Sequence, residues 1–351
     1  MNADILFDRR GAAGLVTLNR PQSLNAVSHA MVRSLAAKLA EWQADPAVTR
    51  VVVTANGGRA FSAGGDLRRL YELGRAGHYD EALSFFGEEY QLNAMIKHYR
   101  KPYVSLIDGI VMGGGAGISV HGSHRVAGDR FAFAMPEVGI GFFPDIGATW
   151  FLTRMPGELG AYCALTGERL TAADGVGTGI ATHRVASSRF PELVEALCGN
   201  VSVDAILAAF AQPTGEGPVV VQRTAIDRMF DKDRVEDVLA DLDQVAAERG
   251  ESDAEFARVA AALMRTKSPT SLKLTLRQLQ LGKSCDFDQC MRTEYRIVSR
   301  VVRGHDLYEG IRAVIIDKDQ TPGWQPAALE AVSDVEVERH FAPIADEPQL
   351  P

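Results

Sequence analysis

Hydrophobic residues near the start of the chain form short apolar runs separated by a glycine-containing turn. The runs at residues 5–7 and 15–18 flank a segment that contains Gly11 and Gly14, which predicts a β-hairpin. Ser28 then precedes apolar residues spaced three or four positions apart, as on one face of a helix: Met31, Leu35, Leu39 and Trp42. The pattern therefore predicts a hairpin followed by an amphipathic helix with Ser28 as its N-cap.

Two further apolar runs, at residues 51–53 and 103–107, each lead into a glycine-rich loop. The first loop, 61–66, precedes a helical pattern at 67–73, and the second, 112–117, precedes a helix that we expect to continue to His121. More β-type segments occur at 124–127 and 131–134. Alternation of strands and helices predicts an α/β fold, in which sites lie where strands end and helices begin.

From about residue 190 the glycine content falls and the pattern becomes helical. Apolar spacing predicts helices at 204–210, 235–247, 253–264, 271–281 and 285–303. The proline-containing segment after Thr321 is expected to wrap around the protein or fray. We therefore expect two parts, an α/β core at 1–190 that carries the site and a helical region at 191–351 that packs on it.

Composition excludes several classes of partner. The 351 residues include 37 Lys and Arg against 45 Asp and Glu, a net charge of −8, which gives no global attraction for nucleic acid or an anionic membrane. The four cysteines form no C-x-x-C pair, so we expect reduced thiols. The sequence shows no run of about 18 apolar residues and no basic-then-apolar leader, so we expect a cytoplasmic protein with a small-molecule partner.

Glycines are concentrated in one part of the chain: 17 of the 33 lie between Gly57 and Gly147. The dinucleotide spacing G-x-G-x-x-G does not occur, and Gly282-Lys283-Ser284 lacks the first glycine of a P-loop. Two interpretations remain. The loops at 63–64 and 113–114 present backbone N–H groups to a developing oxyanion, or their glycines permit close packing. The pattern alone leaves both open.

Two acids lie in an apolar loop at residues 135–145. Glu137 and Asp145 have Met, Val, Ile and Phe as neighbours, and burial there would raise the pKa of a carboxyl group toward the range of general acid–base catalysis. The alternative is a surface loop with two solvated acids. His121 and His124 have no third ligand at a metal-site spacing, so we expect packed or surface histidines and no metal.

Four motifs in order resemble the landmarks of the crotonase (enoyl-CoA hydratase/isomerase) superfamily. They are Leu18-Asn19-Arg20-Pro21 with Leu24-Asn25-Ala26, then Phe61-Ser62-Ala63-Gly64-Gly65-Asp66, then Asp108-Gly109 with Gly113-Gly114-Gly115, and Met135-Pro136-Glu137. The resemblance implies a core of spiral ββα turns and C-terminal helices that often mediate homo-oligomers. It also implies an acyl-CoA substrate, with no cofactor beyond that coenzyme A, and an oxyanion hole made by the N–H groups of Ala63 and Gly114.

One catalytic glutamate of the hydratases is replaced by Gly117, whereas the other matches Glu137. Asp145 stands where hydratases usually have glycine, and further segments over residues 5–326 resemble a thioester-hydrolase branch of the superfamily. In that branch the substrate contacts correspond to Glu89, Gly114, Glu137 and Asp145. The resemblance implies hydrolysis of a short branched 3-hydroxyacyl-CoA in valine catabolism. Glu137 would be the base or nucleophile, and Asp145 would hold the 3-hydroxyl and handle protons.

Two other functions stay open at this stage. A hydratase or isomerase could pair Glu137 with Asp145, and an acyl-CoA-binding protein could use the same loops without turnover. Arg20 and Arg59, in the basic first seventy residues, are candidates to meet the phosphates of coenzyme A.

Overall fold

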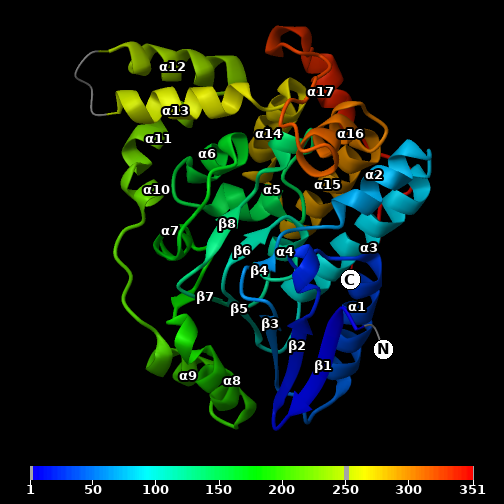
Figure 1. Ribbon diagram of the computed structural model, residues 1–351, viewed down its shortest axis with the longest axis vertical. Helices are drawn as coiled ribbons and strands as arrows, with labels where there is room; N and C mark the ends of the chain where they lie inside the picture. The colour runs from blue at the N-terminus through cyan, green and yellow to red at the C-terminus, as the bar shows by residue number, and fades with distance from the viewer. Residues whose placement is uncertain (1–2, 249–252, 351) are drawn as a thin grey trace.

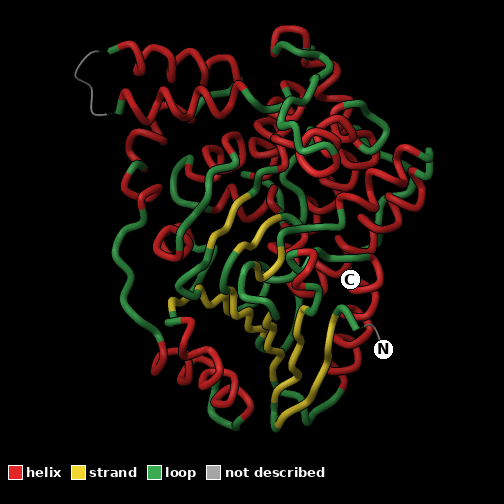
Figure 2. Tube along the Cα trace, viewed as in Figure 1, coloured by secondary structure: helices red, strands yellow, loops and turns green. Residues whose placement is uncertain are grey.

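Two β-sheets form the centre of the computed structural model, which describes residues 3–248 and 253–350 (Figures 1 and 2). The larger sheet has the order β1(Ile5–Arg10), β2(Ala13–Leu18), β3(Arg50–Ala55), β5(Tyr103–Ile107), β7(His124–Ala127) and β9(His183–Arg184). Its strands are parallel except for the β1–β2 hairpin, which the sequence predicts. The smaller sheet is parallel, with the order β4(Ala60–Ser62), β6(Ile110–Met112) and β8(Ala132–Ala134).

Successive turns of the chain contribute one strand to each sheet, so that β3 leads to β4, β5 to β6, and β7 to β8. The corner between β5 and β6 needs Gly109, whose φ is +91°, because a Cβ there would lie 2.6 Å from the carbonyl oxygen of Arg59. Asp108 links neighbouring turns by accepting hydrogen bonds from the backbone N–H of Arg130 at 2.9 Å and from the hydroxyl of Ser187 at 2.8 Å. The expected spiral α/β core is confirmed.

Helices within the core agree in part with the sequence pattern. Helix α1(His29–Ala44) begins as predicted, because the Ser28 side chain accepts a hydrogen bond from the N–H of Met31. Helix α2(Leu67–Arg75) follows the first glycine loop, but α4(Gly114–Gly117) is a single turn and ends before His121. Helix α3(Tyr79–Lys97) lies outside the sequence-based predictions, because buried Glu89 and Asn93 interrupt its apolar face.

The rest of the chain after β8 is largely helical, and Figure 1 shows most of the later helices gathered at one end of the sheets. The helices are α5(Ala148–Phe151), α6(Leu159–Thr166), α7(Ala172–Thr178), α8(Phe190–Cys198), α9(Val203–Phe210), α10(Pro218–Val221), α11(Arg223–Phe230), α12(Val235–Ala247), α13(Ala254–Arg265), α14(Pro269–Gly282), α15(Phe287–Val301), α16(Asp306–Ile311) and α17(Asp334–Phe341). The five predicted C-terminal helices correspond to α9, α12, α13, α14 and α15.

Packing within the later part of the chain differs from one helix to the next. Helices α8 and α9 pack on the larger sheet, where Leu193 and Leu207 join Val52 and Val104 in one apolar cluster.

The segment after Thr321 includes α17, which the proline pattern did not indicate. The boundary at residue 190 stays a prediction. In the described part of the chain, no helix is long and apolar enough to cross a bilayer.

Candidate active site

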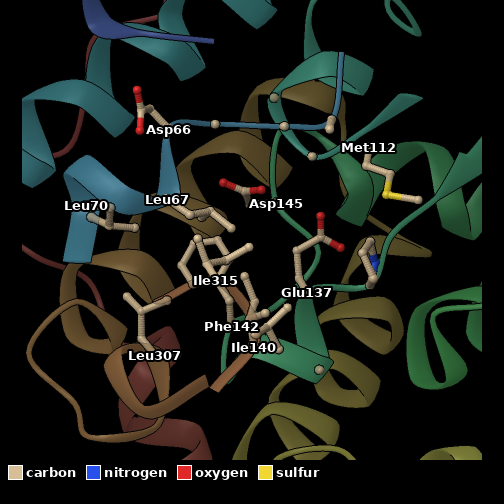
Figure 3. Close-up of a pocket in the computed structure, with 18 of the residues that line it drawn as sticks. Asp66, Leu67, Leu70, Met112, Glu137, Ile140, Phe142, Asp145, Leu307 and Ile315 are labelled. Carbon is tan, nitrogen blue, oxygen red and sulfur yellow. The ribbon is translucent and has the colours of Figure 1, made fainter. Parts of the chain in front are cut away.

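A cavity of 420 Å³ lies where the two glycine loops meet the loop that follows β8 (Figure 3). Four acids line it: Asp66 forms an ion pair with Arg20, and the other three, Glu89, Glu137 and Asp145, are buried. Much of the remaining wall is apolar and comes from α2, α3, the 137–142 segment and the 307–315 segment: Leu67, Leu70, Phe85, Phe86, Ile140, Phe142, Leu307, Val314 and Ile315. The cavity thus combines a few carboxyl groups with apolar walls, as small-molecule sites commonly do.

The first glycine loop does not present the N–H group that the sequence predicts. The N–H of Ala63 donates to the carbonyl oxygen of Leu24 at 3.0 Å, so the assignment of Ala63 to the oxyanion hole is wrong. The same loop forms a parallel bridge between Val27 and Gly65. The N–H of Gly65 has no hydrogen-bond acceptor among the described residues. Gly65 is therefore the residue of this loop with a free donor.

The second glycine loop brings Gly114 next to that donor. Gly114 is the first residue of α4, so its N–H has no acceptor within the helix. A Cβ on Gly114 would lie 3.4 Å from the nitrogen of Gly65 and 2.5 Å from Oε1 of Glu89. Neither N–H has an acceptor among the residues that the structure describes, so two backbone donors adjoin one point of the cavity, which is the arrangement that an oxyanion needs.

Glu137 lies in the cavity at the first position of a short 3₁₀ helix, η2(Glu137–Ile140). Glu137 is 6% exposed, and a Cβ on Gly113 would lie 3.4 Å from Oε1 of Glu137. Its Oε2 has no hydrogen-bond partner in the part of the chain described. Burial, together with the nearby Asp145 carboxylate, holds the pKa of Glu137 well above its usual value. The prediction of a buried acidic loop is confirmed, and the solvated-loop alternative is wrong.

Asp145 points into the same space as Glu137 (Figure 3). The hydroxyl of Tyr90 donates to its Oδ2 at 2.9 Å. Burial raises the pKa of Asp145 to about 7, although the Tyr90 hydrogen bond acts in the opposite direction. A carboxyl group with a pKa near 7 can gain or lose a proton at neutral pH.

Glu89 is the third acid and comes from α3, the helix that the sequence pattern missed. It is 2% exposed, and its Oε1 has no hydrogen-bond partner among the described residues. Burial, followed by repulsion from Asp145, raises the pKa of Glu89 well above its ordinary value. Because charged carboxylates repel in an apolar site, a negative charge on Asp145 raises the pKa of both Glu89 and Glu137.

The loop that carries Asp145 is held from both sides. Nε2 of Gln278, on α14, donates to the carbonyl oxygen of Pro144 at 2.5 Å. Nε2 of His121 donates to the carbonyl oxygen of Ile146 at 2.6 Å. His121 is thus a packed histidine, as expected, and His124 pairs separately with Asp204 at 3.0 Å.

Glu294, on α15, caps the start of α5 next to Asp145. Its carboxylate accepts hydrogen bonds from the N–H of Gly147 at 2.7 Å and from the N–H and hydroxyl of Thr149 at 2.9 and 2.6 Å. Sequence reasoning missed both Glu294 and Gln278, because local spacing does not show that these helices reach the 144–149 loop. Their polarity on otherwise apolar helix faces was the available signal.

Gly117 has no room for a second catalytic glutamate. A Cβ there would lie 2.8 Å from Nδ2 of Asn93 and 3.0 Å from Cβ of Ile146. A larger side chain would require the Asn93 side chain to move and Ile146 to shift by a few tenths of an ångström. The replacement of the hydratase glutamate by Gly117 is therefore accompanied by close packing of Asn93 and Ile146 around that position.

Neither proposed arginine lines the cavity. Arg20 donates to Asp66 at 3.2 Å and to the carbonyl oxygen of Ala26 at 2.8 Å, so it braces the first glycine loop. Lys267 is the one cation among the described residues that line the cavity, and burial lowers its pKa. The spatial arrangement thus favours Lys267 over Arg20 and Arg59 as the positive group at this site.

A spiral α/β core with two backbone N–H donors and buried acids is typical of one class of enzymes. Comparison with known proteins identifies the same class. Residues 13–341 match the model of the enoyl-CoA hydratase/isomerase family. The chain therefore belongs to the enoyl-CoA hydratase/isomerase (crotonase) superfamily, and it is an enzyme of that superfamily that acts on acyl-CoA.

Within the superfamily the chain is similar to 3-hydroxyisobutyryl-CoA hydrolases. It is 42% identical to the mitochondrial enzyme of Danio rerio, over 97% of this chain and 90% of that protein. It is 43% identical to the mitochondrial enzyme of Rattus norvegicus, over 97% and 89%. These relatives place the chain close to the hydrolase branch.

Two solved structures have the same fold over almost the whole chain. A carnitinyl-CoA dehydratase from Mycobacterium thermoresistibile matches with a TM-score of 0.93 and 42% identity, over 99% of both chains. An enoyl-CoA hydratase from Rhodobacter sphaeroides 2.4.1 matches with a TM-score of 0.89 and 37% identity, over 97% of this chain and 98% of that one. The fold is therefore shared by proteins named for different reactions.

Because of its buried acids, we expect the folded protein to become less stable as the pH rises from acidic to weakly basic values. Asp145, with a pKa raised to about 7, and Glu294, with one raised to about 8, keep protons in the folded state that the unfolded chain releases. Because the folded state binds more protons, the free energy of unfolding decreases as pH rises from about 4 to about 8. At about 1.4 kcal/mol for each pH unit over which a buried acid keeps its proton, we expect urea denaturation to show a loss of about 4 kcal/mol or more over this range.

A pair of variants checks the origin of this pH dependence. Asp145→Asn should reduce the decrease, whereas Glu216→Gln, at an exposed position, should leave it unchanged. A decrease that is the same in all three proteins would contradict the assignment to buried acids.

Proposed function

We propose that the protein hydrolyses the thioester of a short branched 3-hydroxyacyl-CoA, converting 3-hydroxyisobutyryl-CoA to 3-hydroxyisobutyrate and coenzyme A. The observation that carries the proposal is that the site has one hydratase-type glutamate, Glu137, and lacks the second. A pair of free N–H groups lies beside Glu137, while the space of a second hydratase-type glutamate is closed by Asn93 and Ile146. Similarity to the 3-hydroxyisobutyryl-CoA hydrolases supports the same reaction.

In this proposal the thioester carbonyl oxygen accepts hydrogen bonds from the N–H groups of Gly65 and Gly114. These donors gain strength as negative charge develops on the oxygen in the tetrahedral transition state. Because the surrounding wall is largely apolar, little water competes with them. The loops thus polarise the carbonyl group.

Glu137 supplies the reacting carboxylate. As a general base it takes a proton from water while the water oxygen bonds to the carbonyl carbon, and the C–S bond then breaks to release the thiolate. As a nucleophile its oxygen bonds to the carbonyl carbon and expels the thiolate, and water then hydrolyses the anhydride. In both routes the thiolate takes up a proton and leaves as coenzyme A.

Asp145 and Glu89 supply the remaining polar contacts. A 3-hydroxyl group near them can donate to whichever carboxylate is ionised and accept from the one that is protonated. The apolar side chains of Phe86, Phe142 and Ile315 would surround the branched carbon skeleton. The expected preference is therefore for short branched acyl groups with a 3-hydroxyl.

A second candidate is the reversible addition of water to an enoyl-CoA. The names of the two solved relatives favour it, and so does the presence of Glu89 and Asp145 as possible partners for Glu137. In that reaction the thioester stays intact.

A thiol-release assay separates the two functions. With 3-hydroxyisobutyryl-CoA we expect free coenzyme A to appear, and with crotonyl-CoA we expect neither thiol release nor hydration. Hydration of crotonyl-CoA without thiol release from either ester would favour the second candidate. Tight binding of both esters without turnover would indicate an acyl-CoA-binding protein and contradict the proposal.

A further inference from the structure

A second cavity, of 340 Å³, lies at the amino-terminal ends of β5 and β7. It shares no lining residue with the active-site cavity. Four cationic side chains line it: Lys97, Lys101, Arg125 and Arg154. Among the described residues, no Asp or Glu lines it. In a chain with a net charge of −8, such a concentration of positive charge needs an explanation.

The cations of this basic cavity are held by neutral groups. Arg125 donates to the carbonyl oxygens of Ile180, Gly122 and Gly179 at 2.9–3.0 Å. Within residues 3–248 and 253–350, none of the four cations forms an ion pair with a carboxylate. Backbone carbonyl groups therefore orient Arg125, while the positive charge of the four side chains has no carboxylate partner in the part of the chain described.

Lys97 is central to the arrangement. Its Nζ lies 3.7 Å from the centre of the Trp150 ring, and the guanidinium carbon of Arg154 lies 4.5 Å from the centre of the same ring. Burial, followed by repulsion from Arg125 and Arg154, lowers the pKa of Lys97. The attraction of Lys97 to an anion in the cavity would offset this repulsion.

His121 gives an independent indication of the kind of anion. It is 5% exposed and lines the basic cavity, and its Nδ1 has no hydrogen-bond partner among the described residues. Because Nε2 donates its proton to the carbonyl oxygen of Ile146, Nδ1 of the neutral ring is an acceptor. Burial lowers the pKa of His121 to about 3, so the ring is neutral at physiological pH. The cavity wall therefore carries four cations and one buried acceptor that has no partner among the described residues.

We propose that the basic cavity binds a phosphate group that carries one proton, either inorganic phosphate or a phosphomonoester, at a place separate from the acyl-CoA site. The unprotonated oxygens would accept from Lys97 and Arg125, and the P–OH would donate to Nδ1 of His121. Sulfate, which has the same shape but no proton at neutral pH, cannot make the last bond. Since His121 also holds the carbonyl oxygen of Ile146, the bound phosphate would adjoin the loop of Asp145.

Calorimetric titration of the full chain tests the proposal. At pH 6.5 and constant ionic strength we expect inorganic phosphate to bind with one site per chain and more tightly than sulfate. Adenosine monophosphate distinguishes the sources, because tighter binding than inorganic phosphate would indicate a phosphomonoester. If neither inorganic phosphate nor adenosine monophosphate shows detectable binding, the proposal is overturned. Equal affinity for phosphate and sulfate would overturn it as well.

Variants locate the binding site. Lys97→Met, which retains the apolar stem, should weaken phosphate binding about tenfold by removing a charge-assisted hydrogen bond. Arg154→Met, at an exposed position, provides a second test that is less dependent on folding. The matched control is Lys38→Met, because Lys38 also lies over a tryptophan ring, at 5.9 Å from that of Trp42, but outside the cavity. If Lys97→Met and Arg154→Met bind phosphate as tightly as Lys38→Met does, phosphate does not bind in the basic cavity, and the proposal is contradicted.

Discussion

Replacing Glu137 with glutamine is expected to lower kcat for thioester hydrolysis by about 10²-fold or more. Glutamine has nearly the same shape, so the cavity and KM should change little, but an amide can act neither as a base nor as a nucleophile. The measurement is steady-state thiol release with 3-hydroxyisobutyryl-CoA. This loss should be seen whether Glu137 activates water or attacks the carbonyl directly.

The matched control for this variant is Glu88→Gln. Glu88 lies next to Glu89 on α3, but its side chain is turned to the surface, where Arg33 lowers its pKa to about 2. Activity should be retained when this residue loses its charge. Near-normal thiol release by Glu137→Gln would rule out the assigned role of Glu137, whatever the outcome with Glu88.

Gly114→Ala should lower kcat by about 10²–10³-fold, the range found when one oxyanion donor is lost. The added methyl group would lie 3.4 Å from the nitrogen of Gly65 and 2.5 Å from Oε1 of Glu89, in the space that the carbonyl oxygen needs. Thiol-release kinetics measure the effect, and circular dichroism checks that the variant is folded.

Gly65→Ala is the informative comparison, because alanine retains the N–H group at both positions and only the direction of the added methyl group differs. Its Cβ would point toward Phe85 at 3.7 Å, an ordinary contact, and should leave most of the activity. A pair of variants with equal activity would contradict the placement of the oxyanion between Gly65 and Gly114. A loss in Gly114→Ala alone would support it.

Elements with a simple period were predictable. Helix α1 and strands β5 and β7 match the expected positions, because apolar residues make up most of the buried positions in each of them. Helix α3 was not predictable in this way, since the same buried face carries Glu89 and Asn93. The polar positions that hid the helix from the pattern are the ones that build the site.

Residue order also identified the acids better than it identified the backbone donors. Glu137 and Asp145 carry their chemistry in their side chains, so their types and neighbours were informative. An N–H group is present in every residue except proline, and only its partner decides whether it is free. Ala63 was chosen wrongly because its acceptor, the carbonyl of Leu24, belongs to a distant segment.

The linear order of residues was sufficient for the superfamily, the spiral core, the helical C-terminal region and the acids at 137 and 145, because periodicity and motif spacing are local properties. Only the folded chain decided that Gly65 and Gly114 hold the free donors and that Glu89 shares a cavity with Glu137 and Asp145. It also decided that Glu294 and Gln278 support the Asp145 loop. Those outcomes depend on hydrogen-bond partners and on exclusion of water, and both are set by segments that are far apart in sequence and close in space.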